Sequence, residues 1–304
     1  MRKQIILFGA GRVGQRALQY YGKENVYCFC DSNKNNQKQY IENKIIDIDE
    51  LSRIYENYDV VISISNIKCL LEVEGILAER EIPYRHFFDE DLTNKIDNTK
   101  IFSDIYAERK WGGIGSLYSG DGSHKDNIII PYINLLNDFI KNNEIKKICD
   151  IGCGDFYIMN QVLKNKDIIY YGLDVVDFLI KYNKETFKND HWNFLKIDAT
   201  KKDSQLPFAD LLIVRQVLQH LDNESIKELL NKIKNYKYVL ITEHVYKGEN
   251  IVYNVDKPIN ENIRLYKKSG VYIEKKPFCI NNIVNLLEVE EMGGVLRTSL
   301  VINI

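Results

Sequence analysis

Acidic residues end three successive apolar runs in the second half of the chain, and a glycine turn follows the first run. Asp150 opens the sequence DIGCGD, whose Gly152 and Gly154 let the backbone turn tightly and lie against a ligand. Asp174 and Asp198 end the next two runs. A carboxylate accepts hydrogen bonds from hydroxyl and amino groups. An acid at the position of Asp174 can accept from both ribose hydroxyls of an adenosine, and an acid at the position of Asp198 can accept from an adenine amino group.

Three residues near the same edge are candidates for taking a proton from a reacting group. His220 is the leading candidate base, because imidazole titrates near neutral pH. The alternative for His220 is a structural histidine packed beside Leu218. Glu243 and His244, which follow the apolar run 238–242, are the other candidates.

Further polar residues are candidates for binding a charged or polar ligand. Arg215 and Arg109 carry guanidinium groups that can bind a phosphate or a carboxylate, although a structural ion pair is the ordinary role of either. Arg215 is predicted among the cofactor-binding residues. His124 follows the glycine-rich run 119–123 and is a candidate to close over the substrate, with an exposed loop residue as the alternative. No spacing of histidines and carboxylates indicates a metal site, so none is predicted.

Short apolar runs alternate with amphipathic stretches of helical length, a pattern typical of α/β proteins with parallel sheets. In the first half, the sequence predicts strands at 5–8, 26–30, 59–64 and 84–87, and helices at 12–21 and 68–80. In the second half, it predicts helices at 127–141 and 223–235, strands at 147–151, 168–173, 194–197, 211–214 and 238–242, and an antiparallel hairpin of 284–289 with 296–302.

The chain is long enough for about two domains. We expect a small Rossmann-like domain of the nucleotide-binding type over 1–100 and a larger α/β domain over 126–304. Between them, residues 101–125 are rich in glycine and aromatic residues and are expected to form a connecting loop that packs over one of the domains.

A second glycine turn lies near the amino terminus. Gly9, Gly11 and Gly14 have the G-x-G-x-x-G spacing between a predicted strand and a predicted helix, and Asp31 ends the next strand. In this dinucleotide-binding fingerprint, a diphosphate approaches the backbone where the helix begins. A nucleotide-linked substrate, NAD(P) and no ligand at all are the alternatives for this turn.

The motifs of the second half resemble those of class I S-adenosylmethionine-dependent methyltransferases. The resemblance rests on the run 150–155, on Asp174 and Asp198, and on the run DLLIVRQVLQHL at 210–221, and it covers residues 103–304. It implies a sheet of parallel strands that ends in an antiparallel hairpin.

The same resemblance implies a role for each residue of the site. Gly152 and Gly154 would carry the amino-acid end of S-adenosylmethionine, Asp174 its ribose and Asp198 its adenine. Asp150 would hold the glycine loop and the ammonium side of the cofactor.

The first half resembles the small Rossmann-like domains attached to bacterial sugar-modifying enzymes. The matching runs are ILFGAG at 6–11, CDSN at 30–33 and VISISN at 61–66, within about residues 3–90. The resemblance implies that this domain holds a nucleotide-sugar.

The overall composition disfavours some classes of partner and some locations. A net charge of -2 and a pI of about 6.3 give no long-range attraction for nucleic acid or an anionic membrane. The six cysteines lack CxxC spacing and are interpreted as reduced thiols of a cytosolic protein. The first apolar run is too short for a signal sequence or a membrane span, so a cytoplasmic location is expected. The oligomeric state cannot be predicted from the sequence.

The sequence thus predicts a methyltransferase that transfers a methyl group from S-adenosylmethionine to oxygen. The expected acceptor is a small polar, sugar-derived or phosphate-bearing metabolite of surface glycan biosynthesis, such as a capsular polysaccharide precursor, with a nucleotide-linked form included. The alternatives are a methyltransferase with a nitrogen or carbon acceptor, and an NAD(P)-dependent oxidoreductase that works through the first glycine turn.

Overall fold

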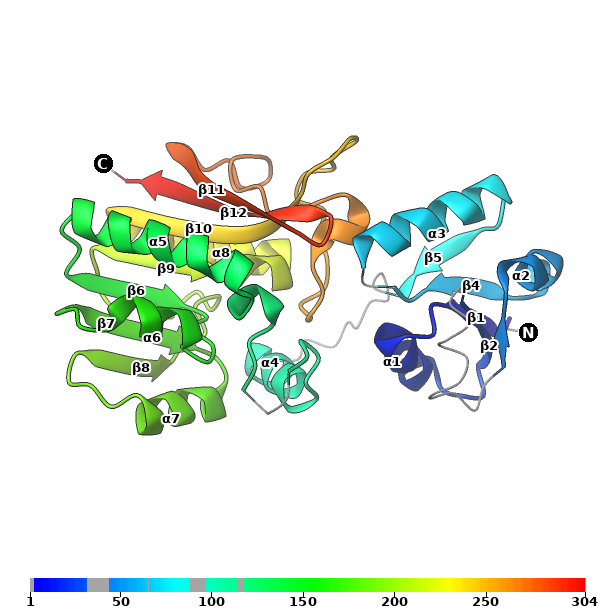
Figure 1. Cartoon of the computed structure of the whole chain (residues 1–304), viewed down its shortest axis with the longest axis horizontal. Coiled ribbons are helices and arrows are strands. Elements are labelled where there is room, and N and C mark those ends of the chain that lie inside the picture. The colour runs from blue at the N-terminus through cyan, green and yellow to red at the C-terminus, as the bar shows by residue number, and fades with distance from the viewer. Residues whose placement is uncertain (1–2, 32–43, 65, 88–96, 114–116, 304) are drawn as a thin grey trace. The chain divides into compact units, whose positions relative to one another are not determined.

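The computed structural model describes residues 3–31, 44–64, 66–87, 97–113 and 117–303 of the chain. The chain divides into two compact units, Met1–Leu92 and Thr93–Ile304 (Figure 1). Each unit has its own sheet and its own apolar core, and each is described separately below. None of the helices in the described ranges is long and apolar enough to cross a membrane.

The first unit contains a five-stranded parallel sheet in the order β3-β2-β1-β4-β5. The strands predicted for this part of the chain are present, and β3 is an additional short strand. The strands are β1 (Ile5–Phe8), β2 (Val26–Cys30), β3 (Ile45–Ile46), β4 (Asp59–Ile62) and β5 (Tyr84–His86), and the helices are α1 (Arg12–Tyr21), α2 (Ile48–Ile54) and α3 (Ile67–Glu79).

Strand β1 is the centre of this sheet because all four of its residues are apolar and buried. Leu7 packs with Val26, Phe29 and Val61 in the core of the unit. Helix α1 lies close to the end of β1, since a Cβ on Gly14 would be 2.0 Å from the carbonyl oxygen of Gly9. Close packing of the helix on the strand is the role of the third glycine in the fingerprint.

The second unit contains a seven-stranded sheet in the order β11-β12-β10-β9-β6-β7-β8. Strands β6 to β10 are parallel, and β12 lies antiparallel between β10 and β11. The strands are β6 (Lys147–Ile151), β7 (Ile169–Asp174), β8 (Trp192–Lys196), β9 (Leu211–Arg215), β10 (Tyr238–Tyr246), β11 (Ile283–Glu291) and β12 (Gly294–Ile302). The predicted α/β architecture with a C-terminal antiparallel hairpin is confirmed.

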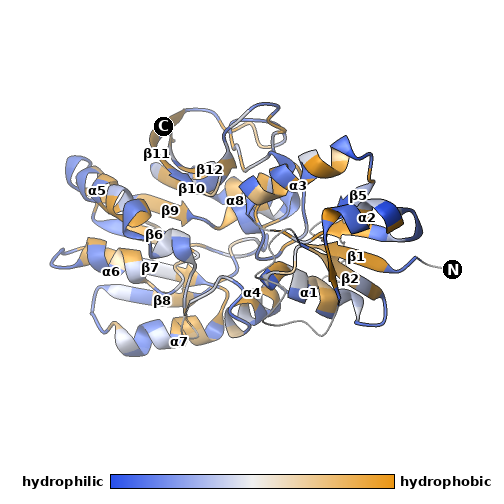
Figure 2. Cartoon of the chain, turned by 45° about the vertical axis from the view of Figure 1, so that its right-hand side comes forward, coloured by the Kyte–Doolittle hydropathy of each residue, from blue (hydrophilic) through white to orange (hydrophobic). Residues whose placement is uncertain are grey.

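Two apolar clusters cover the two faces of this sheet. Alternate residues of β6 point to opposite faces, so Ile148 belongs to one cluster and Cys149 to the other. The first cluster includes residues of α5 (Asp126–Asn142), α6 (Tyr157–Leu163) and α7 (Asp177–Thr186), and the second includes residues of α8 (Asn223–Lys232). Figure 2 shows the corresponding pattern: strand β9 is largely hydrophobic, and the helices beside the sheet carry both hydrophobic and hydrophilic residues.

The segment before α5 differs from the sequence prediction. Residues expected as a connecting loop over 101–125 begin with a helix, α4 (Asn98–Ala107). Ile105 and Tyr106 are buried, and Tyr106 packs with Val176 and Leu179 of the second unit. The helix places these apolar side chains against the apolar surface of the second unit, where they are buried. The glycine-rich residues that follow have fewer apolar side chains to bury.

Candidate active site

The carboxyl ends of the parallel strands bring the predicted site residues to one edge of the second sheet. Ile151 of β6 lies beside Leu173 of β7 and Val214 of β9 in the strand register. Because these positions are adjacent, the residues that follow each strand share this edge. Asp150, Gly152, Gly154, Asp174, Asp198 and Arg215 therefore lie in one region.

The glycine loop after β6 is tight, and its glycines are required by geometry. Gly152 and Gly154 have φ values of 73° and 53°, a region that favours glycine. A Cβ on Gly152 would be 2.4 Å from Cγ2 of Val217, and a Cβ on Gly154 would be 2.5 Å from Oγ of Ser119. The amides of Gly152 and Cys153 both donate to the carbonyl oxygen of Leu173, at 2.8 and 3.0 Å.

Asp174 holds this loop in place. Its Oδ2 accepts from the amide of Gly154 at 3.1 Å, and its Oδ1 accepts from the amide of Val176 at 2.9 Å. Burial raises the pKa of Asp174 to about 6. A carboxylate has about four acceptor positions, so both oxygens retain capacity for ribose hydroxyls. The predicted ribose contact stays a prediction.

The other two predicted acids also have partners within the unit. Oδ2 of Asp150 accepts from the hydroxyl of Tyr170 at 2.7 Å, and burial raises the pKa of Asp150 to about 7. Oδ1 of Asp198 accepts from the amide of Thr200 at 3.0 Å, while Oδ2 accepts from Nδ2 of Asn98 at 3.2 Å. The side chain of Asn98 thus takes one acceptor position of the carboxylate that was predicted to bind adenine.

One segment contacts the ends of several strands, and we call residues 98–113 and 117–124 the covering segment. Asn98 reaches Asp198 after β8, as described above. Nε1 of Trp111 donates to the carbonyl oxygen of Glu261 at 3.3 Å, and its ring centroid lies 5.1 Å from that of His220. The covering segment therefore lies over the edge where the predicted cofactor residues gather.

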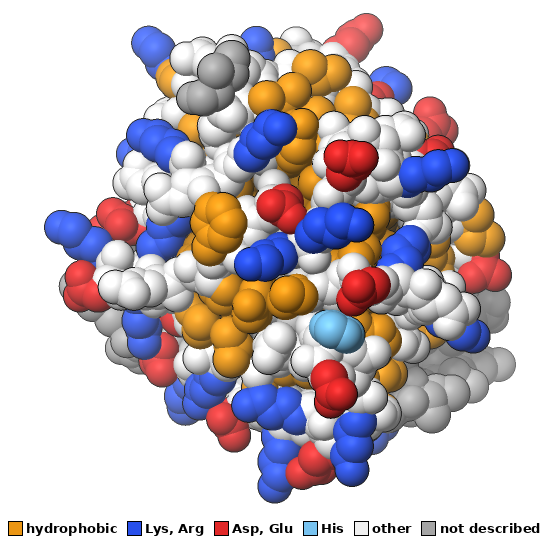
Figure 3. All heavy atoms as spheres, turned by 90° about the vertical axis from the view of Figure 1, so that its left-hand side faces the viewer, with side chains coloured by type: hydrophobic (Ala, Val, Ile, Leu, Met, Phe, Trp, Pro, Cys, Tyr) orange, Lys and Arg blue, Asp and Glu red, His pale blue; other side chains and the backbone are white. Residues whose placement is uncertain are grey.

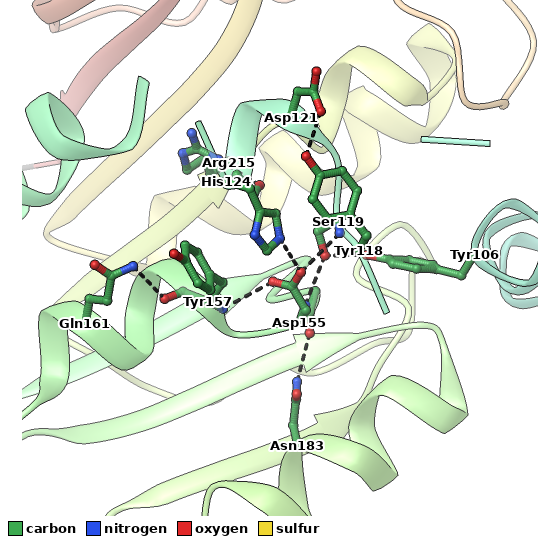
Figure 4. Close-up of polar contacts among 12 residues, drawn as sticks. Tyr106, Tyr118, Ser119, Asp121, His124, Asp155, Tyr157, Gln161, Asn183 and Arg215 are labelled. Atoms are coloured by element: carbon green, nitrogen blue, oxygen red, sulfur yellow. Dashed lines mark hydrogen bonds and ion pairs between the residues drawn. The ribbon is translucent and has the colours of Figure 1, made fainter. Parts of the chain in front are cut away.

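Asp155 is the main anchor of the covering segment on the glycine loop (Figure 4). Its Oδ2 accepts from the amide of Ser119 at 3.1 Å, and its own amide donates to Oγ of Ser119 at 3.0 Å. Nε2 of His124 lies 2.7 Å from the same Oδ2. The sequence analysis included Asp155 in the glycine motif but assigned it no role.

The imidazole of His124 is fixed by rings on both sides as well as by Asp155. It stacks on Tyr118 at 4.3 Å and on Tyr157 at 4.4 Å between ring centroids. When Nε2 donates to Asp155, Nδ1 is the nitrogen that can accept a proton. The structure thus places His124 in a carboxylate–imidazole pair at the glycine loop, and its predicted contact with the substrate stays a prediction.

His220, the leading candidate base, lies in a different environment. It is buried, with Nε2 at 3.2 Å from Nε2 of Gln219 and with Nδ1 lacking a partner among the described residues. Burial and, to a smaller extent, the charge of nearby Lys257 lower the pKa of His220 to about 3. Such an imidazole is neutral and is a weak base, and the predicted catalytic role of His220 stays a prediction.

Glu243 and His244, the other candidate bases, have different partners in the structure, and their predicted role stays a prediction. The carboxylate of Glu243 accepts from the amides of Val217, Leu218 and Gln219 at 3.2, 2.9 and 2.9 Å. It therefore fixes the loop after β9, and burial raises its pKa to about 7. Nε2 of His244 bonds the backbone oxygen of Glu291 at 2.8 Å, because successive residues of β10 point to opposite faces.

Arg264 completes the support of this loop and was not anticipated from the sequence. Its guanidinium is buried and donates to the carbonyl oxygens of Gln219 at 3.1 Å and Leu221 at 2.7 Å. Glu243 thus binds the amides of the loop while Arg264 binds its carbonyls. Arg264 lies in the long connection between β10 and β11, where no spacing signal marks it.

Arg215 binds the covering segment instead of an acid. Nη2 donates to the carbonyl oxygen of Gly122 at 2.6 Å, and Nη1 donates to Oγ of Ser123 at 3.2 Å. The guanidinium also lies over the ring of Tyr132, 4.9 Å from its centroid. Arg109, the other candidate for an anion, has a φ of 54° and ends the turn after α4.

The first glycine turn, in the other unit, contains one position open to a ligand. Gly9 and Gly14 face close neighbours, but a Cβ on Gly11 would meet nothing within 4 Å. Oδ2 of Asp31 accepts from the amide of Ala10 at 2.8 Å, so this acid supports the turn itself. The geometry fits the fingerprint, and the nucleotide contact stays a prediction.

A surface hollow lies elsewhere in the second unit. It is lined by residues at the amino ends of β7 and β8, including Lys166, His191 and Trp192. The amino ends are at the opposite edge of the sheet from the glycine loop. We do not assign it to the site.

The sheet order, with the glycine loop after its central strand, defines the fold of class I methyltransferases, as the sequence predicted. No protein-family model matches the chain, and no curated protein matches its sequence.

Solved structures with a similar fold are methyltransferases. An N-methyltransferase, NodS from Bradyrhizobium japonicum WM9 with bound S-adenosylhomocysteine, is 12% identical, with 68% of this chain and 99% of that chain covered at a TM-score of 0.48. Magnesium protoporphyrin IX methyltransferase from Synechocystis PCC 6803, also with S-adenosylhomocysteine, is 13% identical, with 68% and 100% covered at 0.47. Human N-acetylserotonin methyltransferase with S-adenosylmethionine is 15% identical, with 65% and 62% covered at 0.38. Likenesses this distant carry no information on the acceptor.

Proposed function

We propose that the chain is an S-adenosylmethionine-dependent methyltransferase. The observation that carries the proposal is the convergence of Asp174, Asp198 and the glycine loop at one edge of the second sheet, in the strand order of class I methyltransferases. Asp174 binds the loop that would carry the amino-acid end of the cofactor, and it retains acceptor capacity for ribose. Asp198 and its neighbour Ala199 follow the end of β8, where adenine would lie.

The cofactor would supply a methyl group on a positively charged sulfur, which an acceptor atom displaces in line. The contribution of the protein to such a reaction is mainly alignment of the two reactants. The covering segment would limit access of water to this edge, and Glu243 and Arg264 would hold the β9 loop in a fixed position. Each of these functions depends on contacts that are present in the structure.

We further propose an oxygen acceptor on a small polar metabolite, sugar-derived or phosphate-bearing, from surface glycan assembly. A hydroxyl acceptor needs a group to take its proton, and the His124–Asp155 pair beside the glycine loop supports this choice. The first unit would bind a nucleotide handle of the metabolite at α1, where Gly11 is open. Nitrogen and carbon acceptors are the alternatives.

A small-molecule acceptor is also consistent with the net charge of the chain. Lys and Arg side chains are interspersed with Asp and Glu over the face seen in Figure 3. Together with the net charge of -2, this face lacks the field of one sign that attracts a polynucleotide.

Titration calorimetry with S-adenosylhomocysteine tests the proposed function, and NADH tests the oxidoreductase alternative. We expect micromolar or tighter binding of S-adenosylhomocysteine and no heat from NADH. Binding of NADH alone would overturn the proposal and favour an oxidoreductase that works through the first glycine turn.

A further inference from the structure

We propose that Arg215 and Gln216 form a binding site for one carboxylate or phosphate group beneath the loop 118–124. The inference rests on the proposed function in one respect, because the amino-acid carboxylate of the cofactor is one of two possible sources of that group. The other source is an anionic group on the acceptor.

The first observation is a guanidinium without an acid. Arg215 is half-buried, and its two terminal nitrogens donate to neutral oxygens of Gly122 and Ser123. Within the described ranges, no carboxylate oxygen lies within ion-pair distance of Arg215, and Asp150, Glu243 and Asp155 act on its charge only from farther away. A partly enclosed charge without a directly paired acid is costly, so a position of this kind is expected to serve a ligand.

The second observation is a pair of donors that lack acceptors. Nε of Arg215 and Nε2 of Gln216 are buried and have no hydrogen-bond partner among the described residues. Unpaired buried donors are rare in folded proteins because each costs the desolvation of its N–H group. Two such donors on consecutive residues, one of them part of a guanidinium, indicate a position for an anion.

The third observation concerns the backbone and the loop above it. Gln216 has a φ of 55°, a conformation that residues other than glycine rarely adopt and that is concentrated at ligand sites. Gly122 lies directly against the side-chain amide of Gln216, since a Cβ on Gly122 would be 2.4 Å from Oε1 of Gln216. Arg215, Gln216 and Gly122 thus meet at one point.

The geometry of the guanidinium limits the chemistry of the ligand. A planar fork of donors matches the two oxygens of a carboxylate or a phosphate. The donors free for such an anion are Nε of Arg215 and Nε2 of Gln216. The two terminal nitrogens of Arg215 are held by the oxygens of Gly122 and Ser123, so the loop 118–124 fixes the guanidinium from its other side.

The test compares ligands with and without the carboxylate. Titration calorimetry on wild type, Arg215→Gln and Arg215→Lys would use S-adenosylhomocysteine, 5′-methylthioadenosine, which lacks the amino-acid part, and inorganic phosphate. Arg297→Gln serves as the control, because Arg297 is in the same unit and pairs with Glu288. Thermal unfolding verifies that each variant folds, and Arg215→Lys, which keeps the charge, is the fallback if Arg215→Gln does not.

Two results would support the site and would identify the source of the anion. If it is the cofactor carboxylate, Arg215→Gln weakens S-adenosylhomocysteine at least tenfold and 5′-methylthioadenosine less than twofold, with a smaller loss in Arg215→Lys. If it belongs to the acceptor, both nucleosides bind as in wild type, and phosphate binds wild type but not Arg215→Gln.

Two other results would overturn the site. Equal weakening of both nucleosides would mean that Arg215 only supports the fold, and unchanged binding of all three ligands would mean that it binds no anion. Failure of wild type to bind either nucleoside would instead count against the proposed function, and the phosphate measurement would still decide the anion site.

Discussion

Two histidines lie near the same sheet edge, but their surroundings suit them to different tasks. His220 is enclosed beside Lys257 and Trp111, and burial lowers its pKa to about 3. His124 has a carboxylate partner, Asp155, and two stacked tyrosines that hold its ring. A general base needs a group that orients its ring. His124 has such a group in Asp155, whereas the lowered pKa of His220 makes that imidazole, which the sequence favoured, a weak base.

Asp174 is the residue whose loss should affect cofactor binding most directly. Asp174→Asn keeps the shape of the side chain but removes its charge and one acceptor oxygen. We expect the affinity for S-adenosylhomocysteine to fall by about 1.5–3 kcal/mol, the range for a hydrogen bond to a charged group. The free energy of unfolding should fall only modestly, because one of the two amides, of Gly154 or Val176, still has a side-chain oxygen to donate to.

Titration calorimetry measures this effect, with Asp177→Asn as the matched control. Asp177 is the first residue of α7, which follows the same strand, but its side chain is 74% exposed and pairs with Lys196 at the surface. The control should bind as wild type does. If Asp174→Asn also binds as wild type does, Asp174 does not contact the ligand.

At the scale of the elements, the same substitution of glycine by alanine can be compared in the two glycine turns. Gly152→Ala places a Cβ at a φ of 73° and 2.4 Å from Val217. The backbone conformation alone costs about 1–2 kcal/mol in a residue with a side chain, and the contact displaces either the loop or Val217. We expect a lower melting temperature and at least a tenfold loss of affinity for S-adenosylhomocysteine.

Gly11→Ala is the control for the same chemical change in the other glycine turn. Gly11 has a φ of -73° and open space around its Cβ position. Differential scanning fluorimetry should therefore show an unchanged melting temperature, and cofactor affinity should stay the same. Equal effects of the two substitutions would contradict the assignment of the second turn as the cofactor loop.

The covering segment should depend on Asp155 for its attachment. In Asp155→Asn, only one side-chain oxygen remains for the amides of Ser119 and Tyr157 and the imidazole of His124, which two oxygens serve in the wild type, and the charge on these bonds is lost. We expect amide hydrogen exchange over 117–124 to accelerate roughly tenfold or more, because opening of this loop becomes easier. Exchange in α8 should stay the same, and an unchanged rate in the loop would show that other contacts suffice.

The sequence predicted the elements that carry strong local signals and missed those that depend on distant contacts. Strands β6 and β7 were predicted because apolar runs end in an acid or a glycine turn. Helix α4 was missed because it has few apolar residues and its periodic signal is therefore weak. These residues pack on positions about 70 residues away, such as Val176. The contact of Trp111 with Glu261 spans 150 positions, and no spacing rule indicates it.

The same distinction applies to the candidate site. The sequence pointed to Gly152, Asp174 and Asp198 because each lies at or just after the end of a predicted strand. It did not indicate that Glu243 supports a loop, because the three amide partners of Glu243 belong to the loop after another strand. A polar residue at a strand end indicates a site edge, but only its partners distinguish binding from support.

At the scale of the whole molecule, the division into two units makes a prediction about independence. Each unit has a closed set of sheet pairings and its own apolar core. We expect residues 97–304 alone to fold and to bind S-adenosylhomocysteine within about threefold of the full chain, as measured by calorimetry. A large loss of affinity would show that residues 1–92 contribute to the cofactor site.

Stability should also depend on pH through acids buried in the second unit. Burial raises the pKa of Glu243 to about 7, well above its value in an unfolded chain, which is about 4.3. Between these values the folded state binds a proton that the unfolded state has released. The contribution of Glu243 to stability is therefore fully present below about pH 4 and is lost as the pH rises through about 7, with a slope of up to about 1.4 kcal/mol per pH unit.

Glu243→Gln removes this titration while leaving one oxygen to accept from the β9 loop. The variant should be less stable than wild type at pH 5, because the amide of Gln219 loses its acceptor, and the difference should shrink by pH 8. His220, whose pKa is lowered, acts in the opposite direction below about pH 6.5 but is common to both proteins and cancels in the comparison. Urea unfolding of both proteins from pH 5 to pH 8 measures the two curves, with the exposed Glu274→Gln as control. Parallel curves for wild type and Glu243→Gln would show that Glu243 stays ionised when folded, held by its three amide donors and by the charge of Arg264.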